Sequence, residues 1–287
     1  MNTSFRSILI PVDLSINTEI AVKKGLELAD NGTIIHLLHV QSHNLTGFSG
    51  MTRQFQDSVN SSTGEKEITH CLEQWKSSIE DCDKDIKVFL SLTKRGSIQQ
   101  AIEKKAIAAG ADLIIIGKNS HHSWFPFLNT VISSRLVQNT GIPVLTVKPG
   151  SFHNKTRKVV VPILTQTAGQ KMEIILTICQ KFRVQIYLVT FFGSRDEPLD
   201  YYASSLLQAY KWLKTSIGCP VDYAVLQGRN KAKAILNYAE KINADILLLY
   251  PETETKIGWM NQQISDVLPA STKVEVLTVR HLPSPVM

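Results

Sequence analysis

Short apolar runs alternate with longer amphipathic stretches along the 287 residues of the chain. Each apolar run has the length of a buried strand, and each amphipathic stretch has apolar positions at helical spacing. One such helical face carries Ile68, Leu72, Trp75, Ile79 and Cys82. The first half is predicted to have strands over 8–12, 34–40, 88–92, 113–116 and 144–147, and helices over about 18–30, 98–109 and 130–138. Apolar strands joined by helices indicate a parallel sheet covered on both faces.

Local signals predict where several of these helices begin and end. Asn31-Gly32 predicts the end of the first helix, and Gly110 predicts a left-handed stop at the end of the helix over 98–109. The run Ser97-Ile98-Gln99-Gln100 is typical of a capping box at a helix start. The polar segment from Gln41 to Lys66 follows the second strand, and we expect a mobile loop there.

The same pattern is stated twice along the chain. Three stretches of the first half recur in the second: 7–15 as 158–165, 110–117 as 243–250, and 142–148 as 274–280. An internal repeat of this kind fixes the architecture before any propensity argument. It predicts two tandem doubly wound α/β domains with parallel sheets, over residues 1–149 and 156–287, divided at the polar stretch between them.

The two copies differ at positions that could carry chemistry. Leu164 falls opposite Asp13, and Tyr250 falls opposite Gly117. Asn243 stands where Gly110 stood, and asparagine also tolerates a left-handed helix stop. The repeat therefore predicts equivalent folds but unequal sites.

Composition and charge narrow the class of protein. A hydrophobic content of 43% with 20% charged residues is ordinary for a globular protein. The net charge of +6, without basic runs interleaved with aromatics, argues against a nucleic-acid partner. No apolar run is long enough to span a membrane, and no apolar targeting core precedes the first strand. The four cysteines lack metal-finger spacing, so we expect reduced thiols in a cytoplasmic protein.

Ligands of open α/β sheets bind beyond the carboxyl ends of the strands. Three pieces of the first half reach that edge: Pro11-Val12-Asp13, His39-Val40, and the run that begins with Gly117. A glycine at a strand end lets backbone amides approach a phosphate. The expected role of His39 is packing rather than catalysis.

These residues resemble the universal stress protein family, and the resemblance extends over nearly the whole chain as a tandem two-domain member. It rests on Ile10-Pro11-Val12-Asp13, Leu38-His39-Val40, the run from Ala111 to Gly117, and the run from Gly141 to Val147. The resemblance implies the adenine nucleotide alpha hydrolase-like fold, a pseudo-dimer joined through the final strands, and an ATP-binding motif in one branch of the family. The ligand that the resemblance implies is ATP with Mg²⁺. The residues that it implies as contacts of this nucleotide are Pro11, Val12, Asp13, Val40, Gly117, Ser120, Asn129, Thr130 and Val131.

The chain departs from that motif in both halves. Ser120 and Asn129 replace two of the motif's glycines, the spacer is one residue short, and the bulky run 121–127 lies between them. In the second half, Tyr250-Pro251-Glu252 occupies the phosphate-loop position, where Pro251 has no amide to donate and Glu252 would repel phosphate. Only the first half therefore keeps a candidate nucleotide site.

No other motif predicts an enzyme. The pair His121-His122 has no Cys, Asp or Glu ligand nearby, so no metal site is expected. The leading hypothesis is a non-catalytic binding or regulatory module in the stress response, with an unknown protein or small-molecule partner and a possible further homodimer. The alternatives are an ATP sensor that uses the first half only, or a slow nucleotide hydrolase.

Overall fold

The computed structural model describes residues 4–13, 15–41, 62–93, 97–118, 131–152, 155–164, 169–191, 199–228, 230–251, 256–257, 262–264, 268 and 271–280. Strands of the first half are β1 (Phe5–Pro11), β2 (Ala29–Val40), β3 (Lys87–Thr93), β4 (Leu113–Gly117) and β5 (Val144–Val147). Those of the second half are β6 (Lys158–Pro162), β7 (Gln185–Phe191), β8 (Val221–Leu226), β9 (Ile246–Leu249) and β12 (Glu275–Thr278), with a separate hairpin of β10 (Lys256–Ile257) and β11 (Gln262–Gln263).

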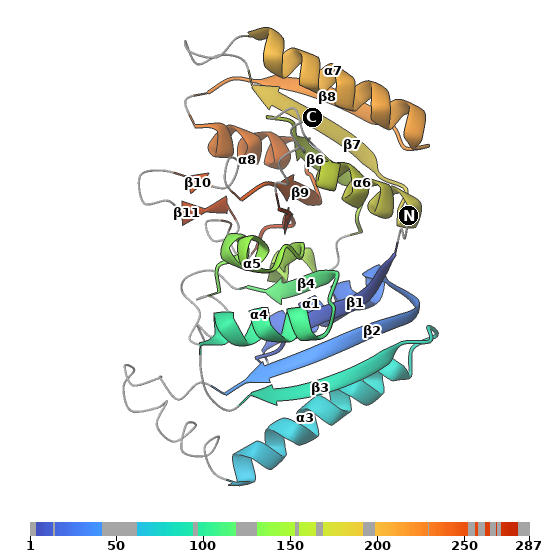
Figure 1. The fold of residues 1–287 in the computed structure, drawn as a ribbon, viewed down its shortest axis with the longest axis vertical. Coiled ribbons are helices and arrows are strands. Elements are labelled where there is room, and N and C mark those ends of the chain that lie inside the picture. Colours follow the sequence, from blue (N-terminus) through green and yellow to red (C-terminus); the bar gives the residue numbers. More distant parts are fainter. Residues whose placement is uncertain are drawn as a thin grey trace.

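Ten strands form one sheet in the order β3-β2-β1-β4-β5-β12-β9-β6-β7-β8 (Figure 1). Within each half the pairs are parallel, and the order of the second half mirrors that of the first. The predicted fold class, two tandem doubly wound parallel-sheet units, is confirmed.

Helices cover both faces of this sheet. In chain order they are α1 (Ile16–Leu28), α3 (Ser62–Glu80), α4 (Ile98–Ala108), α5 (Ser133–Thr140), α6 (Gly169–Lys181), α7 (Leu199–Ser216) and α8 (Lys231–Lys241), with the 3₁₀ turn η2 (Pro149–Ser151). Alternate residues of a strand point to opposite faces. On β1, Ile8 and Ile10 accordingly join the buried cluster beneath α1, α3, α6 and α7, whereas Leu9 joins the cluster beneath α4 and α5.

Both left-handed helix stops are present. Gly110 has φ of 56° and Asn243 has φ of 53°, so the two copies end the same helix in the same backbone conformation. Asparagine thus substitutes for glycine without changing the local fold.

The structure corrects the predicted end of one helix and the predicted cap of another. Helix α1 ends at Leu28, and Asn31-Gly32 lies inside β2, because Ala29 is already extended and pairs with Phe5 of β1. Ser97 occupies the N-cap position of α4, but its side chain makes no capping hydrogen bond, so the predicted capping box is wrong.

Two predicted helix starts also change. Helix α5 begins at Ser133 rather than near residue 130, with Ile132 at its N-cap position. Helix α3 begins at Ser62, inside the segment predicted to be a loop from Gln41 to Lys66. Residues 42–61 of that segment lie outside the described part of the chain.

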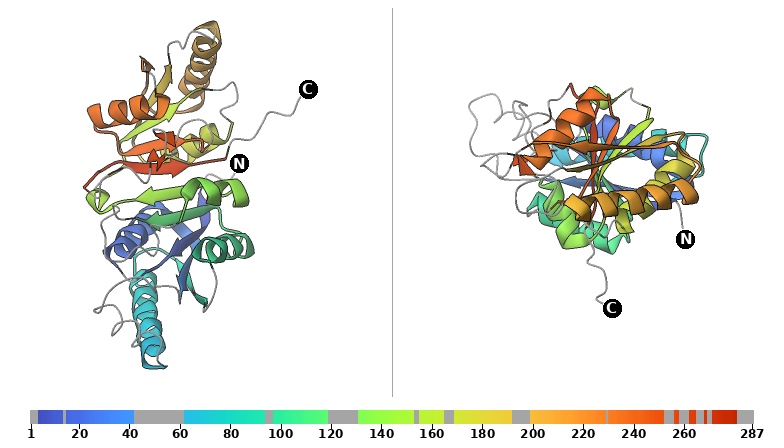
Figure 2. Two further views of the ribbon diagram at one scale, coloured as in Figure 1. Left: turned by 90° about the vertical axis from the view of Figure 1, so that its left-hand side faces the viewer. Right: turned by 90° about the horizontal axis from the view of Figure 1, so that it is seen from above.

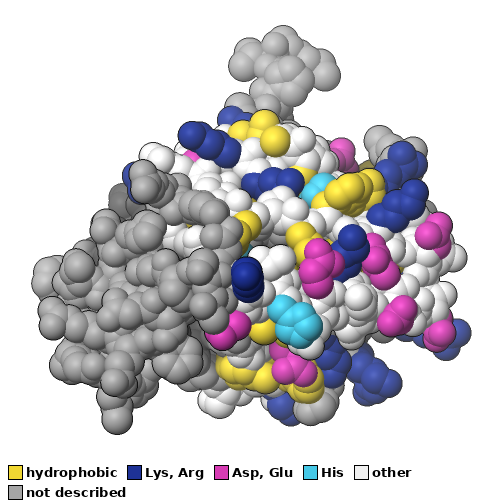
Figure 3. All heavy atoms as spheres, turned by 90° about the horizontal axis from the view of Figure 1, so that it is seen from below, with side chains coloured by type: hydrophobic (Ala, Val, Ile, Leu, Met, Phe, Trp, Pro, Cys, Tyr) yellow, Lys and Arg dark blue, Asp and Glu magenta, His cyan; other side chains and the backbone are white. Residues whose placement is uncertain are grey.

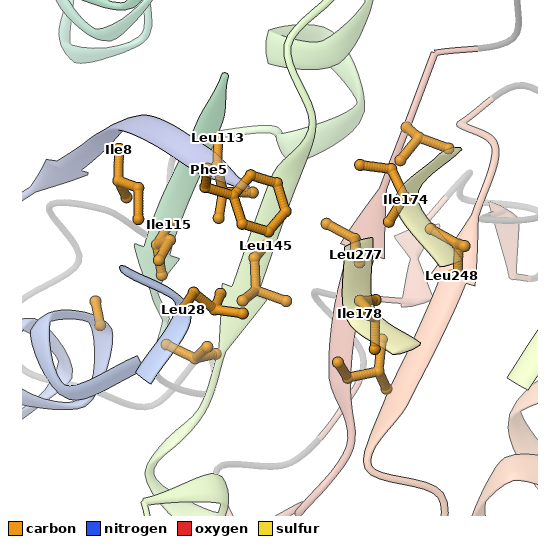
Figure 4. Packing of buried hydrophobic residues seen from close by; sticks show 14 of the residues in the cluster. Phe5, Ile8, Leu28, Leu113, Ile115, Leu145, Ile174, Ile178, Leu248 and Leu277 are labelled. Atoms are coloured by element: carbon orange, nitrogen blue, oxygen red, sulfur yellow. The ribbon is translucent and has the colours of Figure 1, made fainter. Parts of the chain in front are cut away.

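The two halves are joined by an antiparallel pair at the centre of the sheet, visible between the green and red strands of Figure 2. At this seam, β5 pairs with β12, and Leu145 lies opposite Leu277. Both leucines belong to one buried cluster that runs continuously from the first half into the second (Figure 4). The apolar edge strand of each half is therefore covered by the other half.

A buried ion pair crosses the seam beside these leucines. The Nζ atom of Lys24 on α1 lies 3.0 Å from a carboxylate oxygen of Glu275 on β12 and 2.7 Å from one of Glu27. Burial raises the pKa of Glu275 to about 7, although Lys24 opposes that shift. Burial lowers the pKa of Lys24, but the Glu275 and Glu27 carboxylates outweigh it and raise that pKa above its usual value.

The molecular surface mixes charges of both signs where it can be seen. On the face viewed from the β3 end, basic and acidic side chains are interspersed (Figure 3). The described residues of that face therefore form no broad basic patch. Among the helices of the described residues, none combines the length and the apolar character needed to cross a membrane.

The raised pKa of Glu275 predicts a pH-dependent stability. Because the folded state holds this proton more tightly than the unfolded chain, the stabilising contribution is complete below the ordinary pKa of 4.5 and is lost as the pH rises to about 7. We expect the free energy of unfolding of the wild type to fall more between about pH 5 and pH 8 than that of Glu275→Gln. Urea unfolding of both proteins at several pH values measures this difference, and parallel pH curves would contradict it.

Candidate functional site

The candidate site lies at the carboxyl edge of the first-half strands, where the strand order switches. From β1 the sheet continues to β2 on one side and to β4 on the other. Pro11 ends β1, Val40 ends β2, and Gly117 ends β4, so the structure brings these three predicted residues to one edge. Such a switch point is where open α/β sheets bind ligands.

Asp13 follows β1 and braces the start of α1. Its Oδ1 atom accepts hydrogen bonds from the Ser15 amide at 3.1 Å, the Ser15 hydroxyl, and the Thr18 hydroxyl at 2.9 Å. The Asp13 amide in turn donates to the Thr18 hydroxyl oxygen. A carboxylate is favourable here because the positive end of the helix dipole faces it.

The hydrogen bonds from described residues use one oxygen of this carboxylate. Among the described residues, Oδ2 of Asp13 accepts no hydrogen bond, and the side chain is partly exposed. One oxygen therefore holds α1 in place, while the other remains available to a ligand hydroxyl or amine.

His39 ties the end of β2 to the end of β1. Its Nδ1 atom lies 2.9 Å from the carbonyl oxygen of Val12. A carbonyl can only accept, so Nδ1 carries the proton. Burial lowers the pKa of His39, against the opposing effects of the Val12 hydrogen bond and the Asp13 charge. His39 is therefore a buried neutral donor, and the predicted packing role fits this geometry.

Gly117 is required by close packing against α1. A Cβ atom at this position would lie 2.0 Å from the carbonyl oxygen of Asn17 and 2.6 Å from its carbonyl carbon. The first turn of α1 thus presses directly against the end of β4. This packing is a structural reason for the glycine that the sequence did not reveal, beside its predicted role in phosphate approach.

Part of the predicted site cannot be placed. Ser120, Asn129 and Thr130 lie outside the described residues, as do His121 and His122. Val131 is described and is buried just before α5, where it packs against the ends of β2 and β4. Within the described ranges, no group of three or more His, Cys, Asp or Glu side chains could hold a metal ion.

Two buried lysines at this edge were not predicted. Lys118 follows β4 and Lys148 follows β5, and these strands pair side by side, with Gly117 opposite Val147. The side chains are 2% and 1% exposed, respectively. A buried ammonium requires hydrogen-bond acceptors or opposite charge. The only signal in the sequence was a lysine directly after each buried strand.

Three large side chains lie buried at the equivalent edge of the second half. Lys171 of α6 is buried, and its Nζ donates to the carbonyl oxygen of Pro162 at 2.7 Å while lying 4.0 Å from the centre of the Tyr250 ring. Tyr250 and Leu164 are buried as well. An aromatic ring and a cation thus occupy the space beside the end of β6, where Leu164 offers no carboxylate.

Comparisons with known proteins point to one family. The model of the universal stress protein family matches residues 4–148. A universal stress protein from Archaeoglobus fulgidus DSM 4304 is 17% identical, with 98% of each chain covered and a TM-score of 0.64. No match was found among curated proteins.

Two further solved structures show the same fold. A putative universal stress protein from Pseudomonas aeruginosa UCBPP-PA14 is 16% identical over 97% of this chain and 94% of its own, with a TM-score of 0.55. The cytoplasmic domain of a prokaryotic cation chloride cotransporter is 9% identical over 96% of both chains, with a TM-score of 0.52. At these identities the likeness extends to the fold alone.

The contact of Gly117 with α1 predicts a strong effect of a single methyl group. Gly117→Ala should lower the free energy of unfolding by about 2 kcal/mol or more, because the backbone of Asn17 must move. Gly218→Ala is the matched control, since nothing lies within 4 Å of its added Cβ, and it should change stability by less than about 0.5 kcal/mol. Chemical denaturation of both variants measures the difference, and equal effects would contradict the assigned contact.

Proposed function

Because the chain belongs to the universal stress protein family, we propose that it acts as a non-catalytic binding and regulatory module in the stress response. The hydrogen bonds of Asp13 and His39 support this proposal. One oxygen of Asp13 braces α1, and His39 is held as a neutral donor to Val12. Both contacts have structural roles, since they fix the start of α1 and tie the end of β2 to the end of β1.

An ATP-sensing role of the first half is the second candidate function. The observation that favours it is the unused Oδ2 of Asp13 at the switch point, where a ribose hydroxyl could donate to it. Pro11, Val40 and Val131 are buried apolar residues at the same edge. Lys118 follows β4, the strand next to β1, and Lys148 follows β5, one strand further along the sheet. Both lysines add positive charge at these strand ends.

The second half serves as a scaffold in this proposal. At its carboxyl edge the Lys171 ammonium lies against the Tyr250 ring and donates to Pro162, and Leu164 offers no carboxylate to a ligand. The direct pairing of β5 with β12 supports the view of the two halves as a pseudo-dimer. The cytoplasm is the proposed location of the protein. Its partner is a protein or small molecule whose identity the family does not fix.

Calorimetry with ATP and Mg²⁺ tests this proposal. At the Asp13 site we expect at most one nucleotide per chain, and binding there at least about tenfold weaker in Asp13→Asn, a loss of about 1.4 kcal/mol. Asparagine keeps an Oδ1 acceptor for Ser15 and Thr18 but replaces Oδ2 with a donor. Asp222→Asn, at an exposed carboxylate on the far edge strand, is the control and should bind as the wild type does.

The same samples distinguish the competing functions. Absence of binding in every protein favours the pure interaction module over the sensor. A second nucleotide whose binding is lost in Lys171→Ala, which removes the cation at the carboxyl edge of the second half, would contradict the scaffold role of that half. Phosphate release above the blank that is lost in Asp13→Asn would establish the hydrolase and overturn the proposed non-catalytic function.

A further inference from the structure

A groove lies on the seam between the halves, along the C-terminal half of α1. Its volume is about 600 Å³, within the range of small-molecule sites. We call it the seam groove; it is lined by Ile20, Lys23, Lys24, Glu27, Ser151, Phe152, Lys155, Thr156, Arg157, Lys181, Phe182 and Arg183. Asp13 lies before the first residue of α1, so the seam groove and the candidate nucleotide site are separate places.

The lining of the seam groove is strongly cationic. Six of its side chains are basic, and Glu27 is its single acidic member. Lys24 is neutralised by Glu27 and Glu275, and Lys181 pairs with Asp30. Within the described part of the chain, Lys155, Arg157 and Arg183 have no acidic partner, and Lys23 lies 3.9 Å from the centre of the Phe152 ring. Like charges gathered in one concave surface repel each other unless an anion joins them.

A structural role accounts for only some of these cations. The C-terminal carbonyls of α1 carry partial negative charge, and lysines near them are favourable. Lys84 donates to the carbonyl oxygens of Leu26 and Ala29, and Lys181 donates to that of Ala29. Burial, and to a smaller extent the nearby Lys181 charge, lower the pKa of Lys84 against the opposing effects of Asp30, Cys82 and Glu27. The helix end is thus satisfied without Lys23, Lys155, Arg157 or Arg183.

The seam groove also has an apolar wall. Phe152 and Phe182 are partly buried, pack against the shared core, and line the groove together with Ile20. Arginine binds phosphate through two parallel hydrogen bonds, and aromatic faces accept flat organic groups. Cations on one side and aromatic rings on the other suit a ligand with a charged part and a flat part.

We propose that the seam groove binds a small molecule that carries two or more linked phosphate groups, with Arg157 and Arg183 as its main phosphate contacts. Arg157 precedes β6 and Arg183 precedes β7, both in the second half, whereas Lys23 comes from α1. A ligand held here touches both halves. It therefore stabilises their association in proportion to its binding free energy.

Calorimetry with sodium pyrophosphate tests this site, because pyrophosphate has no ribose to engage Asp13. We expect binding by the wild type and by Asp13→Asn, and at least about tenfold weaker binding by the double variant Arg157→Ala, Arg183→Ala. The double variant Lys104→Ala, Lys211→Ala loses the same charge from exposed positions outside the groove and should bind as the wild type does. Thermal unfolding without ligand verifies that each variant is folded.

The outcomes separate the seam groove from the candidate nucleotide site. No pyrophosphate binding by the wild type at millimolar concentration overturns the proposal. So does equal weakening in the two double variants, which would indicate general charge attraction. Binding that is lost in Asp13→Asn but kept in the arginine variant assigns the anion to the first-half site and also overturns it, while leaving the proposed family function intact.

Discussion

The pairing of β5 with β12 is the constraint on which the rest of the structure depends. Each half alone would end in a short apolar edge strand, and an uncovered edge of that kind invites aggregation. Antiparallel pairing places Leu145 against Leu277 and continues one buried cluster through both halves. The buried Lys24 and Glu275 pair, the seam groove and the contact of Lys181 with Ala29 exist only because the halves meet in this register.

A shared sheet explains how the two copies can differ in chemistry while keeping one fold. The second half contributes an edge strand and core residues, and these do not depend on its carboxyl edge. Lys171 and Tyr250 lie buried together at that edge, whereas at the first-half edge one oxygen of Asp13 accepts no hydrogen bond from the described residues. Glu275 illustrates the same asymmetry at the seam, since it stands where the first copy has Pro143.

Local and periodic features were predictable from the sequence, and contacts between distant residues were not. Gly110 and Asn243 revealed their left-handed stops because backbone preference is a property of single residues. The internal repeat indicated the doubled parallel sheet, because the same order of strands and helices occurs twice along the chain. The requirement for glycine at 117 depends on the backbone of Asn17, one hundred positions earlier, and the Lys24 partner lies on the last strand. Pattern alone also misjudged the end of α1, because pairing of Ala29 with Phe5 overrides the Asn31-Gly32 signal.

Native-state hydrogen exchange of the seam strands tests most directly whether the halves form one cooperative unit. If they do, the amides of β5 and β12 open only with global unfolding. Their free energies of exchange should then equal those of β1 and β6, the central strands of each half. Exchange at β5 and β12 with a clearly lower free energy, while β1 and β6 stay protected, would show that the halves separate before they unfold and would contradict the account.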